Sequence, residues 1–119
     1  MHELSVCRAL IRQLESLAQE HGGGSLRGVT LRIGPLGGID PALLAHAFAI
    51  ARQGSCAEDA VLTIETAAIR VRCRDCGQTG EATTNRLACS HCGSHRTQLL
   101  GGDEMLITSI ELQEEPDHV

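Results

Sequence analysis

Residues 73–92 read CRDCGQTGEATTNRLACSHC, so two C-x-x-C pairs stand twelve residues apart in the chain. Each pair lets two thiolates converge on one side of a tight turn, and a short hairpin that joins two pairs completes a tetrahedron of sulfur around one zinc ion. Gly77 and Gly93 directly follow the second cysteine of each pair, where a residue without Cβ can take the positive φ of a sharp bend. The sequence therefore predicts a structural zinc site with four ligands, Cys73, Cys76, Cys89 and Cys92.

Two other interpretations of the cysteine pairs are weaker. A disulfide framework is typical of secreted proteins, and the chain shows no secretory signal peptide. A thioredoxin-like redox pair opens a helix after a strand, and neither C-x-x-C is placed in that way. Cys7 and Cys56 lie outside the frame and are most simply small apolar residues in a reducing compartment. Zinc is the favoured interpretation.

Length and composition limit the size of the core. The 119 residues suffice for one domain, or for one domain with a small excursion, and 42% of them are hydrophobic. Phe48 is the single aromatic residue, so the core must be aliphatic. The apolar runs are too short to cross a bilayer, which predicts a soluble, cytoplasmic protein.

The charge balance argues against a nucleic-acid partner. The chain has ten basic residues, all arginine, and fifteen acidic residues, so the formal net charge is −5. Five of the arginines lie in residues 70–96 against only Asp75 and Glu81. We expect these arginines to offset the anionic charge of a four-thiolate zinc centre, and we favour this over an RNA-binding patch.

Apolar periodicity predicts two helices and three strands around the zinc frame. The first helix carries an apolar stripe from Leu4 to Ala18 and ends at the glycines of residues 22–24. Asp40-Pro41 begins the second helix, because an N-cap acceptor precedes a proline in the first turn. The predicted elements are a helix over 4–20, a strand over 29–33, a helix over 40–52, a long strand over 61–72, the zinc ribbon, and a strand over 105–114.

The expected architecture is an α+β fold in which two helices pack on a three-stranded sheet, with an inserted zinc-ribbon subdomain. The inserted ribbon makes the larger domain discontinuous. We expect an α/β domain of residues 1–71 with 100–119 and a zinc-ribbon domain of residues 72–99.

The second informative stretch is the N-terminus, Met1-His2-Glu3. A free α-amine, the backbone nitrogen of His2 and its imidazole can close adjacent chelate rings around one metal ion. Nitrogen donors of this kind suit Ni²⁺ or Cu²⁺ better than Zn²⁺. Because the first amides of a helix have no intrahelical acceptor, a metal can displace their protons without breaking the helix. Taken alone, a histidine at a chain terminus is weak evidence for a metal site.

The chain as a whole resembles the HypA/HybF nickel metallochaperones of [NiFe]-hydrogenase maturation. The resemblance rests on the opening Met-His-Glu, the glycine-rich turn at 34–38, the paired C-x-x-C motifs with Cys92-Gly93-Ser94, and the closing strand EMLITSIE at 104–111. It implies nickel ligands from the Met1 amine, the His2 backbone and ring, and Glu3. It also implies zinc on Cys73, Cys76, Cys89 and Cys92.

The resemblance further implies the partners. These are a nickel-binding GTPase accessory protein, the hydrogenase large-subunit precursor and, in some organisms, urease accessory proteins, with the chain itself a monomer or weak homodimer. One departure is that Ser90 follows Cys89, where the family often has proline. His91 and His95 are then extra nitrogen donors near the zinc, and whether they are solvated or ever replace a cysteine stays open.

The sequence predicts a carrier of Ni(II) and not an enzyme. It supplies no nucleophile beside a base, no phosphate-binding loop and no carboxylate pair in a cleft. Two other classes stay open. One is a zinc-ribbon module that binds proteins or nucleic acid, which the acidic balance and the lack of aromatic stacking residues oppose. The other is a thiol oxidoreductase, which stable stoichiometric zinc would exclude.

Overall fold

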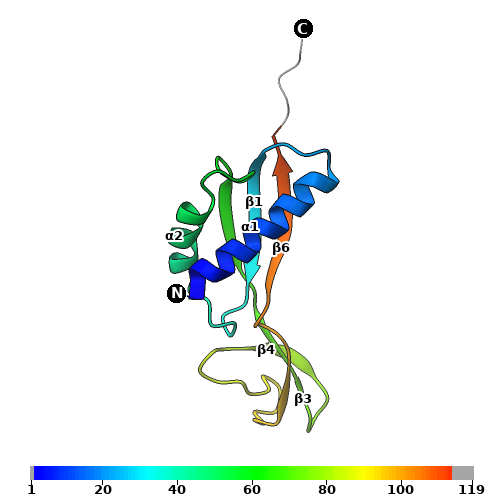
Figure 1. Cartoon of the computed structure of the whole chain (residues 1–119). Helices are drawn as coiled ribbons and strands as arrows, with labels where there is room; N and C mark the ends of the chain where they lie inside the picture. Colours follow the sequence, from blue (N-terminus) through cyan, green and yellow to red (C-terminus); the bar gives the residue numbers. More distant parts are fainter. Residues whose placement is uncertain (1, 114–119) are drawn as a thin grey trace. The chain divides into compact units, whose positions relative to one another are not determined.

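The computed structural model describes residues 2–113, with only the backbone at His2. Figure 1 shows helices and strands in the order expected for an α+β fold, and the predicted fold class is confirmed. The elements are α1 (His2–Glu20), β1 (Leu26–Ile33), α2 (Pro41–Ala51), β2 (Val61–Thr66), β3 (Ile69–Cys73), β4 (Thr79–Ala82), β5 (Thr97–Gly101) and β6 (Met105–Leu112).

The strands form two sheets of three strands each, in the orders β2-β1-β6 and β4-β3-β5. The contacts divide the chain into two compact units. The first takes the chain up to Leu31, Asp40–Thr63 and the chain from Ile107 onward, and the second takes Arg32–Ile39 and Ile64–Leu106. The predicted domain bounds remain a prediction.

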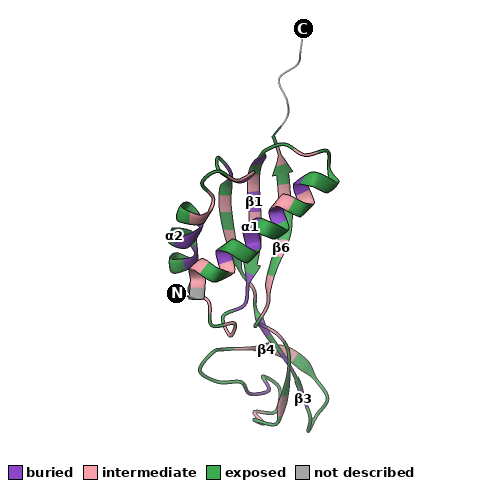
Figure 2. Ribbon diagram, viewed as in Figure 1, coloured by how far each residue is buried: buried purple, intermediate pink, exposed green. Residues whose placement is uncertain are grey.

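The two helices of the first unit pack against each other and carry most of its core. On α1 the apolar stripe is buried as predicted, with Leu10 and Leu14 fully inaccessible to solvent. On α2 the same holds for Leu44, and Phe48 is only 2% exposed. Figure 2 shows the buried positions along one side of each helix. The core is therefore aliphatic around one aromatic ring, as the composition indicates.

The N-terminus of α2 is fixed by the predicted cap. Asp40 has an extended backbone, and its Oδ1 accepts hydrogen bonds from the amides of Ala42 at 2.9 Å and Leu43 at 3.3 Å. Pro41 follows in the first turn, where no amide proton is needed. A cap of this kind contributes about 1 kcal/mol to stability.

Strand β1 is the central strand of the first sheet. Its buried side chains are Leu26, Val29, Leu31 and Ile33. The Gln113 amide donates to the Ser25 carbonyl, and Thr108 Oγ1 donates to the Thr30 carbonyl. Residue numbers therefore rise along β1 as they fall along β6, so the two strands pair in antiparallel fashion.

The long strand predicted over residues 61–72 is wrong in one respect. It is broken at Ala67-Ala68 into β2 and β3, which belong to different sheets. Leu62 and Ile64 are the half-buried positions of β2, whereas Ile69 and the alternate residues after it are the buried ones of β3. Because strand side chains alternate with a period of two, an unbroken strand would place Ile64 and Ile69 on opposite faces. Because of the break, the alternation of buried and exposed side chains starts again at Ile69 in β3.

The sheet of the second unit is antiparallel throughout. Strand β3 lies in its centre and pairs with β4 through Val71 opposite Gly80 and with β5 through Cys73 opposite Thr97. Val71 and Cys73 are buried, while Arg70 and Arg72 are exposed on the other face. This sheet delivers Cys73 to the end of a strand, where the first cysteine pair begins.

The turn after β1 depends on two glycines in close contact. The Gly34 amide donates to the Glu104 carbonyl, and the Leu36 amide to the Gly102 carbonyl, both at 2.7 Å. A Cβ on Gly34 would overlap the carbonyl carbon and oxygen of Gly102. Only a residue without a side chain fits there.

Replacement of Gly34 with alanine should therefore destabilise the zinc-loaded protein by about 1–3 kcal/mol, because backbone must move to relieve the overlap. The matched control is Gly28→Ala in β1, whose new Cβ would meet the Glu111 side chain at an ordinary 3.5 Å. Urea denaturation of both variants measures the difference. Equal stability of the two variants would show that the contact is not tight.

Candidate metal centre

The four predicted zinc ligands converge at one point of the second unit. Their Sγ atoms all lie within 4.8 Å of one another. Two Sγ pairs, Cys73 with Cys92 and Cys76 with Cys89, are each separated by 3.6 Å. A disulfide needs about 2.05 Å, so these are free thiols brought together and not oxidised pairs.

Backbone hydrogen bonds hold the first cysteine of each pair in the same way. Cys73 Sγ accepts from the Asp75 and Cys76 amides at 3.3 and 3.4 Å. Cys89 Sγ accepts from the His91 and Cys92 amides at the same two distances. Such amide donors stabilise thiolate charge. The two C-x-x-C pairs are therefore two copies of one knuckle.

The glycine after each knuckle adopts the predicted conformation. Gly77 has φ +75° and Gly93 has φ +77°. The amide of Gly77 donates to the Cys73 carbonyl and that of Gly93 to the Cys89 carbonyl, which closes each turn. The predicted reason for a glycine at each position, a positive φ that other residues rarely adopt, is confirmed.

The donor set fits zinc. Four sulfurs at about 2.3 Å from a tetrahedral zinc ion lie about 3.8 Å from one another, close to the two 3.6 Å separations. Four protein ligands also fill the coordination shell, so no position is left for water or substrate. The cluster is consistent with a closed, structural zinc ribbon.

The protonation of the sulfurs differs within each knuckle. Hydrogen bonds from the amides of Cys92 and His91 lower the pKa of Cys89 to about 6. The Ser94 amide lowers the pKa of Cys92, but a hydrogen bond with Cys73 and loss of hydration outweigh it and raise that pKa to about 12. Cys92 therefore keeps its proton at neutral pH until a cation displaces it, and the pKa of Cys76 is raised as well.

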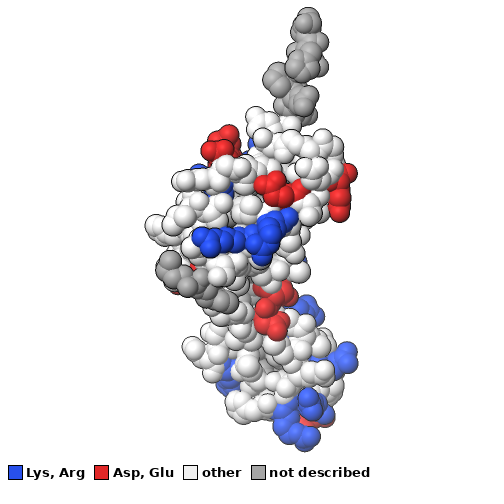
Figure 3. All heavy atoms as spheres, in the orientation of Figure 1, with Lys and Arg blue, Asp and Glu red and all other residues white. Residues whose placement is uncertain are grey.

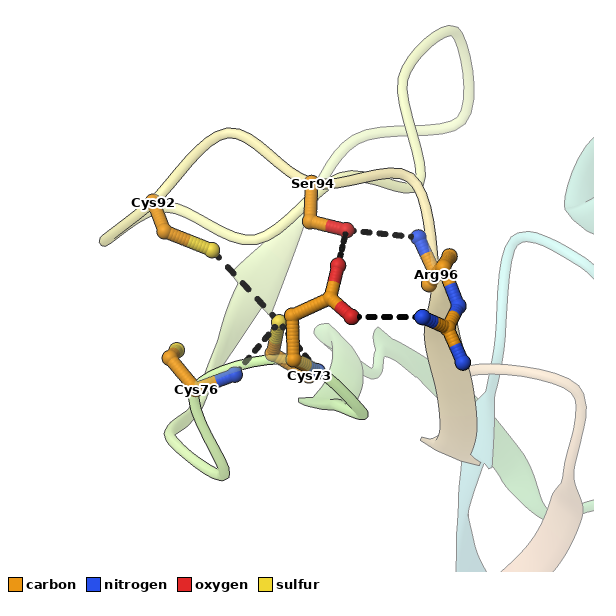
Figure 4. Close-up of polar contacts among 6 residues, drawn as sticks. Cys73, Cys76, Cys92, Ser94 and Arg96 are labelled. Carbon is orange, nitrogen blue, oxygen red and sulfur yellow. Dashed lines mark hydrogen bonds and ion pairs between the residues drawn. The ribbon is translucent and has the colours of Figure 1, made fainter.

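A polar network joins the two knuckles beside the sulfurs (Figure 4). Asp75, inside the first knuckle, accepts hydrogen bonds from Ser94 Oγ and, at 2.8 Å, from Arg96 Nη1. Ser94 Oγ in turn accepts from the Arg96 amide, and the Arg74 amide donates to the Arg96 carbonyl. Sequence analysis did not predict this pairing, because at least nineteen positions separate Asp75 from Ser94 and Arg96.

The arginines of the second unit are exposed but do not form one basic face. Arg96 is paired with Asp75, and Arg70 lies opposite Glu81 in the sheet register. Figure 3 shows acidic side chains among the arginines on the face in view. This distribution favours charge compensation over a nucleic-acid surface.

The predicted nickel residues lie at the start of α1, in the first unit. Met1 lies outside the described residues, as does the side chain of His2, whose backbone begins the helix. Glu3 is half-buried in the first turn and lines a pocket between α1 and α2. The nickel ligand set therefore stays a prediction. His91 and His95 are exposed and are not members of the cysteine cluster, and their role also stays a prediction.

The remaining cysteines behave as core thiols. Cys7 is fully buried, and burial, with the charge of Glu3 adding to it, raises its pKa. Cys56 is half-buried, and burial and Glu15 raise its pKa. Both are thus poor metal ligands and poor nucleophiles at neutral pH.

Comparison with known proteins identifies the family. The model of the family described as "Hydrogenase/urease nickel incorporation, metallochaperone, hypA" matches residues 1–112. The chain belongs to the HypA family. The hydrogenase maturation factor HypA of Nitrosospira multiformis is 42% identical over 112 residues, which are 94% of this chain and 97% of that protein. Its counterpart in Aquifex aeolicus is 36% identical and covers 95% of this chain and 98% of that protein.

A solved structure agrees with this assignment. The solution structure of the Ni metallochaperone HypA from Helicobacter pylori has a TM-score of 0.73 and 28% identity, covering 95% of this chain and 98% of that one. The HypA family consists of metallochaperones, so the predicted carrier of nickel for hydrogenase maturation, non-catalytic and with a four-cysteine zinc site, is confirmed. Within residues 2–113, no helix has the length and apolar character of a membrane span.

Zinc binding should weaken as the pH falls. Protons and Zn²⁺ compete for the same sulfurs, and Cys92, with a pKa of about 12, must release a proton to bind. The zinc affinity should drop by at least about tenfold per pH unit between roughly pH 8 and pH 6. Competition with a chromophoric chelator measures it. An affinity independent of pH would contradict the four-thiolate assignment.

The Asp75 network should slow zinc release. Replacement of Asp75 with alanine removes the acceptor for Ser94 and Arg96 but leaves the backbone amide on Cys73. Because the ion pair is largely exposed, the expected loss is about 1 kcal/mol, or an about fivefold faster transfer of zinc to a chelator. The matched control is Glu81→Ala, an exposed acid of the same sheet. Equal rates in the two variants would show that the network has no such effect.

Proposed function

We propose that this protein binds Ni(II) at its N-terminus and delivers it to the [NiFe]-hydrogenase large-subunit precursor. The cargo ligands are the Met1 amine, the backbone nitrogen and imidazole of His2, and Glu3. Zinc on Cys73, Cys76, Cys89 and Cys92 braces the ribbon. Nickel thus belongs to the domain of residues 1–71 with 100–119, and zinc to residues 72–99.

The observation that carries the proposal is the position of the first helix. Helix α1 begins at His2, so the amides of its first turn have no carbonyl acceptor within the helix. A metal can take the nitrogen of His2 without disrupting α1.

Two donor sets keep the two metals apart. The cysteine cluster offers four thiolates in a closed shell, which suits zinc and folds the ribbon around it. The N-terminus offers nitrogen donors, which suit nickel in square-planar or tetragonal geometry. Ligand softness and geometry, and not affinity alone, then decide which metal occupies which site.

Delivery requires partners that receive or hand on the cargo. The family description names hydrogenase and urease nickel incorporation. We therefore propose three partners: a nickel-binding GTPase accessory protein, the hydrogenase large-subunit precursor, and urease accessory proteins where urease is present. The protein acts in the cytoplasm as a monomer or weak homodimer.

Replacement of His2 with alanine, or acetylation of the N-terminus, should abolish stoichiometric nickel binding and leave the zinc content unchanged. The control is His21→Ala, an exposed histidine at the other end of α1 whose Nδ1 contacts the Leu17 carbonyl. Isothermal titration with Ni(II), together with metal analysis, measures both sites. Nickel binding that survives the loss of His2 would place the cargo site elsewhere.

A further inference from the structure

The solvent-facing side of α2 is apolar, although nothing in the described part of the chain covers it. The sequence of this helix, PALLAHAFAIA, contains one polar residue, His46. Only Leu44, Ala47 and Phe48 are buried, and Figure 2 shows much of the rest of the helix as exposed. A helix that is apolar on all sides is normally covered on all sides. The exposed side of α2 therefore needs an explanation.

The other helix of the same unit shows the usual pattern. The exposed residues of α1 include Arg8, Arg12, Gln13 and Glu20, so its solvent-facing side is polar. The apolar exposed side is thus particular to α2 and is not a general property of this protein's surface. A contiguous exposed apolar patch of this kind marks a contact surface.

This side of α2 has both projecting side chains and a hollow beside them. Leu43 and Ile50 are 52% and 63% exposed, and they lie seven residues apart with His46 and Ala47 midway, which places them in one stripe along the helix. The stripe borders a pocket of about 240 Å³. The lining residues of the pocket are Glu3, Leu4, Leu43, His46, Ala47 and Ile50.

A second copy of the chain fits such a surface. In a two-fold dimer the same patch meets itself, so one patch must supply both the projections and the hollow that receives them. When two α2 helices pack antiparallel about the middle of the stripe, Leu43 of one copy meets Ile50 of the other. The small side chain of Ala47 lets the two helices approach closely.

The charges of α2 agree with this pairing. No charged residue lies within the helix, so two copies meet there without opposing like charges, although each chain carries a formal net charge of −5. Asp40 caps the N-terminus of α2 and Arg52 caps its C-terminus. An antiparallel pair therefore brings charges of opposite sign toward each other at both ends.

The size of the surface indicates that the dimer is weak. A helix of eleven residues is about 16 Å long and about 10 Å wide, so its contact buries on the order of 300 Å² per copy. Stable complexes bury about 800 Å² per partner. The expected dimer is therefore one that forms and dissociates with changes in protein concentration.

We propose that the exposed side of α2, with Leu43 and Ile50 as its projecting side chains, is the contact surface of a weak two-fold homodimer. The proposal rests on the homodimer of the proposed function and not on where nickel binds. Ile50 of one copy enters the pocket between α1 and α2 of the other, which removes apolar surface of both copies from water.

Sedimentation velocity of the full-length, zinc-loaded protein tests this, over concentrations from about 20 μM to about 1 mM that span a weak dimer. The unaltered protein should shift from monomer toward dimer. Ile50→Glu should weaken the association at least about tenfold, because its carboxylate would be buried without a partner. The matched control is Ala9→Glu, which adds the same charge at an exposed position of α1 and should associate like the unaltered protein.

A second measurement locates the contact. In a dilution series followed by NMR, the amide shifts that depend on concentration should be confined to α2 and the first turn of α1. The circular dichroism and zinc content of Ile50→Glu should equal those of the unaltered protein, because Ile50 is exposed.

Three results would overturn the proposal. One is sedimentation as a monomer at every concentration, in which case the surface serves a different protein. The second is association that survives Ile50→Glu, and the third is an equal loss in Ala9→Glu, which would make added charge the cause. Each of these leaves the N-terminal nickel site standing, since that site is tested separately by nickel titration of His2→Ala.

Discussion

The second unit depends on the convergence of four cysteine sulfurs that lie nineteen positions apart from first to last. Hydrogen bonds from backbone amides to Cys73 and Cys89 make the first sulfur of each knuckle a good thiolate, and glycines at positive φ turn the chain back. The sheet around β3 fixes where the first knuckle starts. Without a cation, four sulfurs this close would repel one another once deprotonated, so metal binding and folding of the ribbon must be linked.

The cysteine spacing was enough to predict this centre because knuckle geometry is local. Each C-x-x-C pair, with its following glycine, contains all the atoms that shape its own turn. The Asp75, Ser94 and Arg96 network was not predictable in the same way, since its partners meet only after both knuckles have folded. The count of charged residues showed that the ribbon is rich in arginine, but it could not show which acid each arginine contacts.

The break between β2 and β3 had a sequence signal that the prediction of one long strand overlooked. Ile64 and Ile69 are an odd number of positions apart, so one straight strand cannot bury both on one face. Ala67 and Ala68 lie where the alternation changes, and their side chains are too small to favour either face of a sheet. The helices were predictable because Asp40 and the glycines after α1 mark their ends. The pocket between them was not, because it depends on how two helices pack.

That packing bears on how a carrier can select a metal and still release it. The hydrogen bond from Cys7 Sγ to the Leu44 carbonyl ties the first turns of α1 to α2, and both residues are fully buried. Donor type can select a metal, but the closed cysteine cluster leaves no open position from which its ion could be passed on.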